Sequence, residues 1–326
     1  MRLTHCLPFL LVLLGAQISR ADNPIIKDVF TADPAAMVYR GTLYLYTGHD
    51  EAKGDELFTM RDWLCFSTRD MKSWTPHGSP LSVKDFEWAV RDAWAGQVIE
   101  KRGKFYYYVP VHHDDTHGGF AIGVAISDSP TGPFKDARGS ALITDEMTRG
   151  RRPWNDIDPT VFTDTDGASY LCWGNGDCYF AKLKPNMTEL DGPITSIDLP
   201  GYTEAPWLHR RGNLYYLSYA AIPGGKGGEK IAYATASKVT GPWTYRGIIT
   251  GEALNSFTIH QSIVEFKGQW YFFYHNAVLQ LPDGTRGATG RRSVCVERLY
   301  YNTDGTIQPI VQTTEGVDLP SNKPGQ

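Results

Sequence analysis

The sequence predicts an all-β fold, a single-domain β-propeller of five blades, and two observations on its 326 residues lead to this class. The first is a hairpin with a Gly-x-x-Tyr turn that occurs five times, with successive turn glycines 45 to 64 residues apart, a period typical of four-stranded blades. The turn glycines are Gly41, Gly103, Gly167, Gly212 and Gly268. The second is composition, because 18 Tyr, 14 Phe, 9 Trp, 33 Gly and 20 Pro favour strands and turns over helices.

The outer half of the repeating unit also recurs. Thr131-Gly132-Pro133-Phe134 and Thr240-Gly241-Pro242-Trp243 each place their aromatic residue 31 residues after a turn glycine. No helical stripe longer than about two turns is visible. We therefore expect the propeller to occupy residues 22–312 and a C-terminal tail to occupy residues 313–326.

The first 21 residues have the pattern of an export signal. Arg2 supplies positive charge, Leu7 to Gly15 form an apolar core, and Ser19-Arg20-Ala21 is a small-x-small cleavage site. The apolar run is shorter than the roughly 20 residues that a spanning helix needs. We expect a secreted or periplasmic protein that starts at Asp22 and has no membrane span. The formal net charge of −4 argues against nucleic acid as a partner.

Four cysteines remain after residue 21. Cys172 and Cys178 flank a short segment with the composition of a hairpin turn, so their side chains are expected to meet across two strands. The sequence leaves open whether they form a disulfide. Cys65 and Cys295 are expected to pack as small apolar residues, and no cysteine spacing resembles a zinc site.

Acidic residues recur at one position of the repeating unit. Counting back eight residues from a turn glycine reaches Asp33, Glu204 and His260 in three copies, and Asp158 lies one residue further back in a fourth. This position begins the strand that would line the central channel, so the three carboxylates should converge. Such a set suits hydrolysis of a glycosidic bond, in which an acid protonates the leaving oxygen and a base activates water. A turn role explains an Asp that precedes Pro, but it does not explain Glu204.

At these residues the sequence resembles glycoside hydrolase family 43, from about residue 28 to residue 310. The matching segments are Ala32-Asp33-Pro34, Asp156 to Phe162, Tyr202 to Trp207, Asp92 to Gln97, His260 to Glu265 and Arg292 to Glu297. The resemblance implies a five-bladed propeller and an inverting mechanism. It implies that Asp33 is the general base, Glu204 the general acid, and Asp158 the residue that orients the acid and adjusts its pKa.

The resemblance also suggests residues that bind the substrate. Arg292 would hydrogen-bond the sugar, and Trp94 would form an aromatic wall on which the apolar face of a sugar ring can lie. His49 and Trp173 are expected at the mouth of the pocket. His260 resembles an axial histidine that lies near a calcium ion or a water cluster. Because calcium prefers oxygen ligands, water would complete the shell of an ion near His260. The sequence leaves this calcium site open and implies no organic cofactor.

The expected function is that of a secreted, exo-acting glycosidase that removes α-L-arabinofuranosyl or β-D-xylosyl units from xylan, arabinoxylan or derived oligosaccharides. Its partner would be this plant cell-wall carbohydrate, and we expect a monomer. Arabinofuranosidase is favoured because the sequence ends after the fifth blade, without an added β-sandwich. Two alternatives are an arabinanase of the same fold and a carbohydrate-binding propeller without catalysis.

Overall fold

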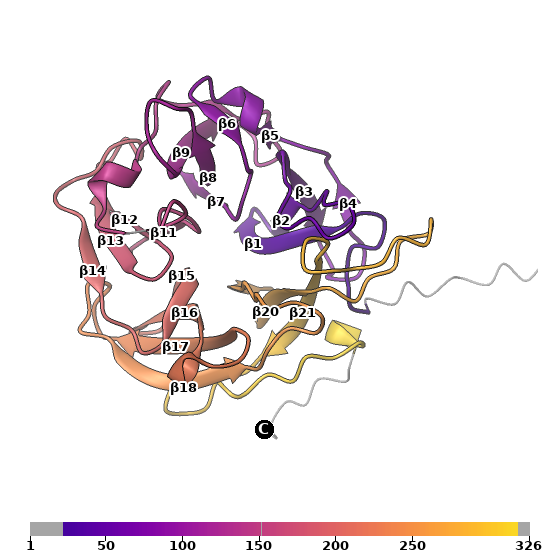
Figure 1. The fold of residues 1–326 in the computed structure, drawn as a ribbon. Helices are drawn as coiled ribbons and strands as arrows, with labels where there is room; N and C mark the ends of the chain where they lie inside the picture. Colours follow the sequence, from indigo (N-terminus) through magenta and orange to yellow (C-terminus); the bar gives the residue numbers. More distant parts are fainter. Residues whose placement is uncertain (1–21, 151, 319–326) are drawn as a thin grey trace, which may run out of the picture.

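The computed structural model describes residues 22–150 and 152–318 and shows five antiparallel sheets arranged around a central axis (Figure 1). The predicted five-bladed β-propeller is confirmed. Helical structure within these ranges is limited to short 3-10 turns. The turns are Val83–Asp85, Asp145–Met147, Pro223–Gly225 and Gly316–Asp318. None of the helices in the described part of the chain is long and apolar enough to cross a membrane. The expected export signal, residues 1–21, lies outside the described residues.

The blades follow one another along the chain. Blade 1 contains β1 (Thr31–Tyr39), β2 (Thr42–His49), β3 (Asp62–Thr68), β4 (Thr75–Pro76) and β5 (Leu81–Ser82). Blade 2 contains β6 (Ala89–Arg91), β7 (Gln97–Lys101), β8 (Lys104–His113), β9 (Phe120–Ser127) and β10 (Lys135–Asp136). Blade 3 contains β11 (Thr160–Thr163), β12 (Ser169–Trp173), β13 (Cys178–Leu183) and β14 (Thr195–Ile197). Blade 4 contains β15 (Tyr202–Arg211), β16 (Leu214–Ala221), β17 (Lys230–Ala236) and β18 (Thr244–Thr250). Blade 5 contains β19 (Ser262–Phe266), β20 (Gln269–Asn276) and β21 (Ser293–Leu299).

Each predicted glycine turn joins the first long strand of a blade to the next strand. In β1–β2, Arg40 and Gly41 have φ angles of 47° and 74°, and in β19–β20, Lys267 and Gly268 have φ angles of 52° and 77°. Two successive positive φ angles are typical of the type I′ turn, whose twist matches that of a two-stranded ribbon. These turns therefore set the register of the inner hairpins of blades 1 and 5.

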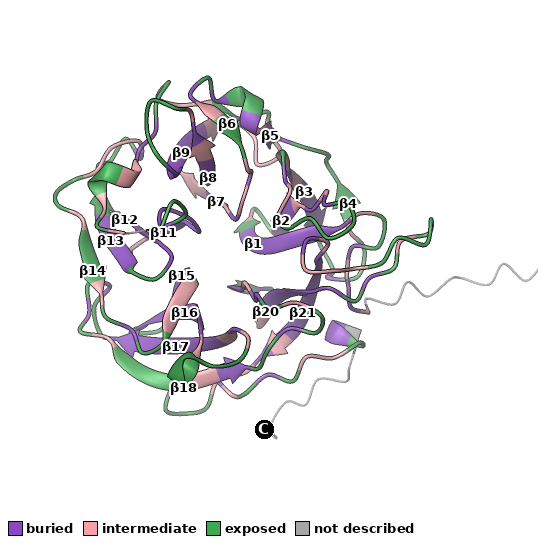
Figure 2. Ribbon diagram, viewed as in Figure 1, coloured by how far each residue is buried: buried purple, intermediate pink, exposed green. Residues whose placement is uncertain are grey.

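The hydrophobic core lies between the blades. Aromatic side chains from adjacent sheets meet there: Tyr46 of β2 lies 5.5 Å from Tyr107 of β8, and Trp63 of β3 lies 5.7 Å from the same ring. All three side chains are fully buried. Figure 2 shows most of β1 as buried, and it shows exposed segments in the peripheral loops and in the outer strands β14 and β18. Burial of these rings against their neighbours stabilises the ring of blades.

The two ends of the described chain meet at blade 5 and close the ring. The backbone N–H of Ile25 donates to Val294 O at 2.9 Å, and the N–H of Val296 donates to Asn23 Oδ1 at 2.8 Å. On the C-terminal side, the backbone N–H of Thr313 donates to Glu297 Oε1 at 2.8 Å. The beginning of the expected tail is thus packed against β21.

The positions of the four described cysteines agree with the sequence predictions. Cys172 on β12 and Cys178 on β13 have their sulfur atoms 3.3 Å apart across the hairpin. Cys65 and Cys295 are fully buried. The disulfide itself stays a prediction.

Candidate active site

The three predicted carboxylates lie where the inner strands of blades 1, 3 and 4 begin. Asp33 has φ 50° and lies where the β1–β2 register shifts, and Asp158 has φ 57° and lies just before β11. Glu204 lies between two register shifts of the β15–β16 pair, and Ala205 after it has φ 55°. Irregularities of this kind re-aim side chains away from the regular alternation of a strand, and they are common beside active sites. The local backbone therefore directs all three carboxylates toward the central pocket.

A pocket of about 560 Å³ brings together Asp33, Asp158, Glu204, Trp94, His260 and Arg292. The sequence predicted a functional role for each of these six side chains. The pocket also has lining residues that it did not predict: Leu57, Phe58, Trp154, Asn175, Glu229 and Phe257. Apolar side chains with a few convergent polar groups are characteristic of small-molecule sites.

Asp33 is held as an ionised carboxylate. Its Oδ1 accepts a hydrogen bond from Arg292 Nη1 at 2.9 Å and lies 3.2 Å from His275 Nδ1. Burial alone would raise the pKa of Asp33, but the positive charge of Arg292 and the contact with His275 outweigh it and hold the pKa well below its usual value. An ionised carboxylate in this position can accept a proton from water.

Arg292 is fixed by a second buried carboxylate. Its Nε donates to Asp50 Oδ2 at 2.9 Å and its Nη2 donates to Asp50 Oδ1 at 3.0 Å, a bidentate arrangement. The guanidinium also lies over the ring of Phe58, 4.8 Å from its centre. Arg292 thus neutralises Asp33 and cannot move away from it without breaking three hydrogen bonds. The sugar contact expected of Arg292 stays a prediction.

Glu204 has the opposite electrostatic environment. Burial and the negative charge of Asp33 raise the pKa of Glu204 to about 7, although a hydrogen bond from Asn175 opposes this rise. Asn175 Nδ2 donates to Glu204 Oε2 at 2.6 Å, and Arg152 Nη1 donates to Asn175 Oδ1 at 2.8 Å. Glu204 is consequently protonated in mildly acidic solution and able to act as a general acid.

Asp158 contacts the chain beside the acid. Its Oδ2 accepts a hydrogen bond from the backbone N–H of Ala205 at 3.0 Å, so it holds the residue that follows Glu204. Burial and the negative charges of Glu204 and Asp33 raise the pKa of Asp158 well above its usual value. Its position suits the orienting role that the sequence suggested.

His260 lies between two of the carboxylates. Its Nδ1 is 3.9 Å from Asp33 Oδ1 and 3.8 Å from Asp158 Oδ2, beyond hydrogen-bond distance. Burial lowers the pKa of His260 to about 4, so the ring is neutral. The oxygens nearest to it are already bound by Arg292 and by the Ala205 N–H. Few protein oxygens near His260 are therefore free, and a calcium ion at this position would take most of its six to eight ligands from water.

Two residues predicted at the mouth of the pocket lie outside it. Trp173 is fully buried, and its Nε1 donates to Asp156 at 2.8 Å, so it has no surface to offer a sugar. The ring of His49 turns to Asp62, with Nδ1 and Oδ1 2.7 Å apart. Within the described residues, His49, Asp62 and Glu51 are also the one group of three side chains close enough to share a metal ion. The predicted mouth position is therefore corrected for both His49 and Trp173.

Sequence reasoning missed three polar residues of the site. Asp50, which holds Arg292, directly follows β2, and Asn175, which holds Glu204, lies at the tip of the β12–β13 hairpin. Glu229 is a fourth carboxyl group in the pocket, and burial, together with the charge of Glu204, raises its pKa to about 10. Of these three residues, only Asn175 had a sequence signal, because it lies between Cys172 and Cys178 in the predicted hairpin turn.

Comparison with known proteins agrees with this geometry. The family model of glycosyl hydrolases family 43 matches residues 21–307. The chain belongs to this family. Family 43 membership makes the protein a glycosidase, and the three converging carboxylates are where its chemistry is expected.

Relatives of known name span nearly the whole chain. A xylosidase/arabinosidase 43A from Humicola insolens is 31% identical over 87% of this chain and 98% of its own length. A xylosidase/arabinosidase from Bacteroides ovatus is 32% identical over 88% of this chain and 96% of its own. Among solved structures, a β-xylosidase/α-arabinofuranosidase from a compost metagenome, in complex with xylotriose and in a calcium-free form, has a TM-score of 0.77. It is 31% identical, and the match covers 90% of this chain and 98% of that one.

Proposed function

We propose that this family 43 glycosidase removes terminal α-L-arabinofuranosyl or β-D-xylosyl units from xylan, arabinoxylan or oligosaccharides derived from them. The observation that carries the proposal is the electrostatic division of one pocket, in which the pKa of Asp33 is lowered and the pKa of Glu204 is raised to about 7. A base and an acid facing one substrate are what hydrolysis of a glycoside requires. The named relatives support this choice of sugars.

The proposed reaction is a single displacement with inversion. Glu204 gives its proton to the glycosidic oxygen as the bond from that oxygen to the anomeric carbon breaks. Asp33 takes a proton from a water molecule whose oxygen forms the new bond to the anomeric carbon on the opposite face. At the end of the reaction Glu204 is ionised and Asp33 is protonated, and exchange with solvent restores both. Asp158 holds the backbone at Ala205 and so keeps the acid aligned.

Apolar side chains at the rim suit a substrate that extends beyond one sugar. Leu57, Trp154 and Phe257 line the pocket, yet they are 55%, 42% and 52% exposed. Exposed apolar groups beside a polar recess are typical of binding surfaces. In the proposed exo action, the terminal sugar enters among the carboxylates and the remaining chain lies on this rim. Release of internal fragments from linear arabinan would instead indicate an arabinanase.

We also propose that the protein is exported. The support is the tripartite pattern of residues 1–21, and sequencing the N-terminus of the protein recovered outside the cytoplasm should give Asp22 as the first residue.

The substrate is tested with aryl α-L-arabinofuranoside, aryl β-D-xyloside, arabinoxylan and linear arabinan, with the released sugars identified and their anomeric form followed by NMR. Release of the first-formed sugar with inverted configuration supports the mechanism, and retained configuration would contradict it. No release from any substrate would favour a carbohydrate-binding propeller without catalysis.

The roles of acid and base are tested by substitution. Glu204→Gln should lose most activity on substrates with a poor leaving group and retain more on aryl glycosides whose phenol is strongly acidic, because such a phenol leaves without a proton. Asp33→Asn should lose activity on both kinds of substrate. Glu87→Gln, at an exposed glutamate away from the pocket, is the control and should behave as the parent. Equal loss on both substrates by Glu204→Gln would refute its assignment as the acid.

A further inference from the structure

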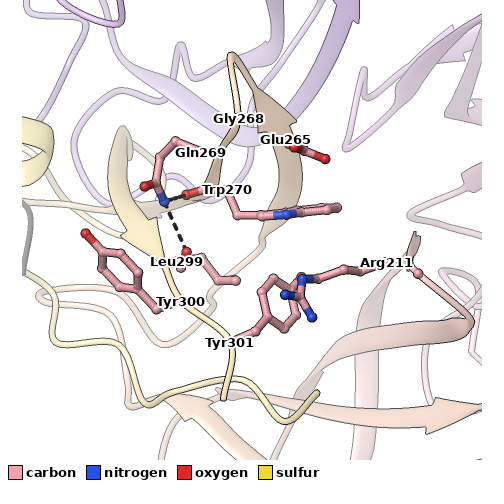
Figure 3. Close-up of a pocket in the computed structure, with 9 residues that line it drawn as sticks. Arg211, Glu265, Gly268, Gln269, Trp270, Leu299, Tyr300 and Tyr301 are labelled. Carbon is pink, nitrogen blue, oxygen red and sulfur yellow. Dashed lines mark hydrogen bonds between the residues drawn. The ribbon is translucent and has the colours of Figure 1, made fainter. Parts of the chain in front are cut away.

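A groove at the other end of the inner strands lies between blades 4 and 5. Figure 3 shows it, and we name it the blade 4–5 groove, formed by Arg211, Glu265, Gln269, Trp270, Tyr300 and Tyr301. Its volume is about 660 Å³. Arg211 ends β15, seven residues after Glu204, and at about 3.3 Å per residue this separates the groove from the catalytic carboxylates by about 20 Å. The groove is therefore no part of the catalytic pocket.

Aromatic rings form the walls of the groove, and the structure holds them in place. Trp270 and Tyr301 meet edge to face with their ring centres 5.5 Å apart, and the hydroxyl of Tyr301 forms a 2.8 Å hydrogen bond with His209 Nε2. The ring of His209 also lies 5.4 Å from that of Trp270. Trp270, Tyr300 and Tyr301 are all partly exposed. Rings that are fixed before a ligand arrives lose little freedom on binding.

Polar groups of both charges border these rings. The Arg211 guanidinium lies over the ring of Tyr301, 4.4 Å from its centre, and the Glu265 carboxylate lies near Trp270 (Figure 3). The amide of Gln269 is positioned by hydrogen bonds from its Nε2 to Trp270 O at 2.8 Å and to Leu299 O at 3.2 Å. One cation, one anion and one neutral amide give the groove donors and acceptors without a net charge.

This combination fits a neutral carbohydrate. Sugar rings without a charged substituent present an apolar C–H face that can lie on an aromatic ring, while their hydroxyl groups both donate and accept hydrogen bonds. Because the opposite charges of Arg211 and Glu265 offset each other, the groove as a whole favours neither an anionic nor a cationic ligand.

We propose that the blade 4–5 groove is a second carbohydrate-binding site, which binds the neutral backbone of a xylan-type polysaccharide away from the catalytic pocket. The choice of polysaccharide rests on the proposed function. The groove holds the enzyme on the polymer, so it contributes to turnover of the polymer. It does not contribute to turnover of a small aryl glycoside, because such a molecule cannot span the distance from the groove to the catalytic pocket.

The test uses the full-length protein with Glu204→Gln, so that the polymer is bound without being cleaved. Affinity electrophoresis through gels containing soluble arabinoxylan measures the dissociation constant. Adding Trp270→Ala should weaken binding at least about fivefold, as expected for loss of a central aromatic contact. Tyr245→Ala removes an exposed aromatic residue of β18 that does not line the groove, and it should leave binding unchanged.

A second variant of the groove keeps the test informative if Trp270→Ala fails to fold. Arg211 and Glu265 are both exposed, so the double change Arg211→Ala and Glu265→Ala should fold normally and also weaken binding. In otherwise unmodified enzyme, Trp270→Ala should keep its activity on the aryl glycoside and lose several-fold in activity on dilute arabinoxylan. Unchanged gel binding by both groove variants would overturn the proposal. Failure of the parent to release any sugar would refute the proposed function alone, since gel binding needs no turnover.

Discussion

Replacing Asn175 with alanine tests how the acid is tuned. The side chain of Asn175 donates a 2.6 Å hydrogen bond to Glu204 Oε2, and this bond lowers a pKa that burial raises to about 7. A hydrogen bond to a charged group contributes about 1.5–3 kcal/mol, and one pKa unit corresponds to about 1.4 kcal/mol. Asn175→Ala should therefore raise the pKa of Glu204 by about one to two units.

The sign of the effect on activity follows from the role of the group. A general acid must be protonated to act, so in the proposed mechanism activity is present below the pKa of Glu204 and is lost as pH rises through it. This loss forms the alkaline limb of the pH profile. In Asn175→Ala a rise of about one to two pKa units should move the alkaline limb from about pH 7 to about pH 8 or 9. The assay is kcat/KM on an aryl glycoside across pH 4 to 10, because kcat/KM reports the ionisation of the free enzyme.

The matched control is Asn186→Ala. Asn186 also donates its amide to a glutamate, Glu189, at 2.9 Å, but this pair is exposed and distant from the pocket. Its pH profile should equal that of the parent. An alkaline limb that stays in place in Asn175→Ala, or moves to lower pH, would refute the assignment of that limb to Glu204.

Three further predictions concern the surroundings of the acid and the base. Arg292→Lys loses the bidentate contact with Asp50 that holds the cation beside Asp33, so the pKa of Asp33 should rise. The fall of kcat/KM on the acidic side of its pH profile should then occur at higher pH. An unchanged acidic side would show that Arg292 does not keep Asp33 ionised. The pKa of Glu229 is raised to about 10 in the folded protein, so the wild type loses stability as pH rises from the pKa of Glu229 in the unfolded chain toward 10. Glu229→Gln should therefore raise Tm at pH 9 and change it little at pH 4. Equal shifts of Tm at both pH values would contradict this. Cys172 and Cys178 should form a disulfide in the exported protein, seen as two fewer alkylated thiols by mass spectrometry, and its reduction should cost about 2 kcal/mol of stability.

The repeating hairpins could be predicted because their signal is local. A Gly-x-x-Tyr turn sets its own geometry through positive φ angles, as at Gly41 and Gly268, whatever the rest of the chain does. The spacing of the carboxylates from these turns was equally informative. The inner strands run from the pocket to the turn, so a fixed count back from the glycine reaches the same end of each blade.

Residues that join the site from other segments could not be found by counting from the turn glycines. Asp50 enters at the far end of β2 and Glu229 enters from the loop before β17, so neither has a fixed distance to an inner-strand glycine. His49 illustrates the limit. It directly precedes Asp50, and neighbouring residues of an extended chain point to opposite sides. An error of one position therefore exchanged the residue that holds Arg292 for one that faces Asp62.

The proposed general base, Asp33, lies where the first and last blades of the propeller meet. Asp33 lies on the first strand, while Arg292 and His275, which hold its charge, come from the last blade. Separation of these two blades would leave the carboxylate without its cation while the other sheets kept their hydrogen bonds. On heating, inactivation should therefore precede the loss of circular dichroism, and covalent linkage of the first and last blades should bring the two transitions together.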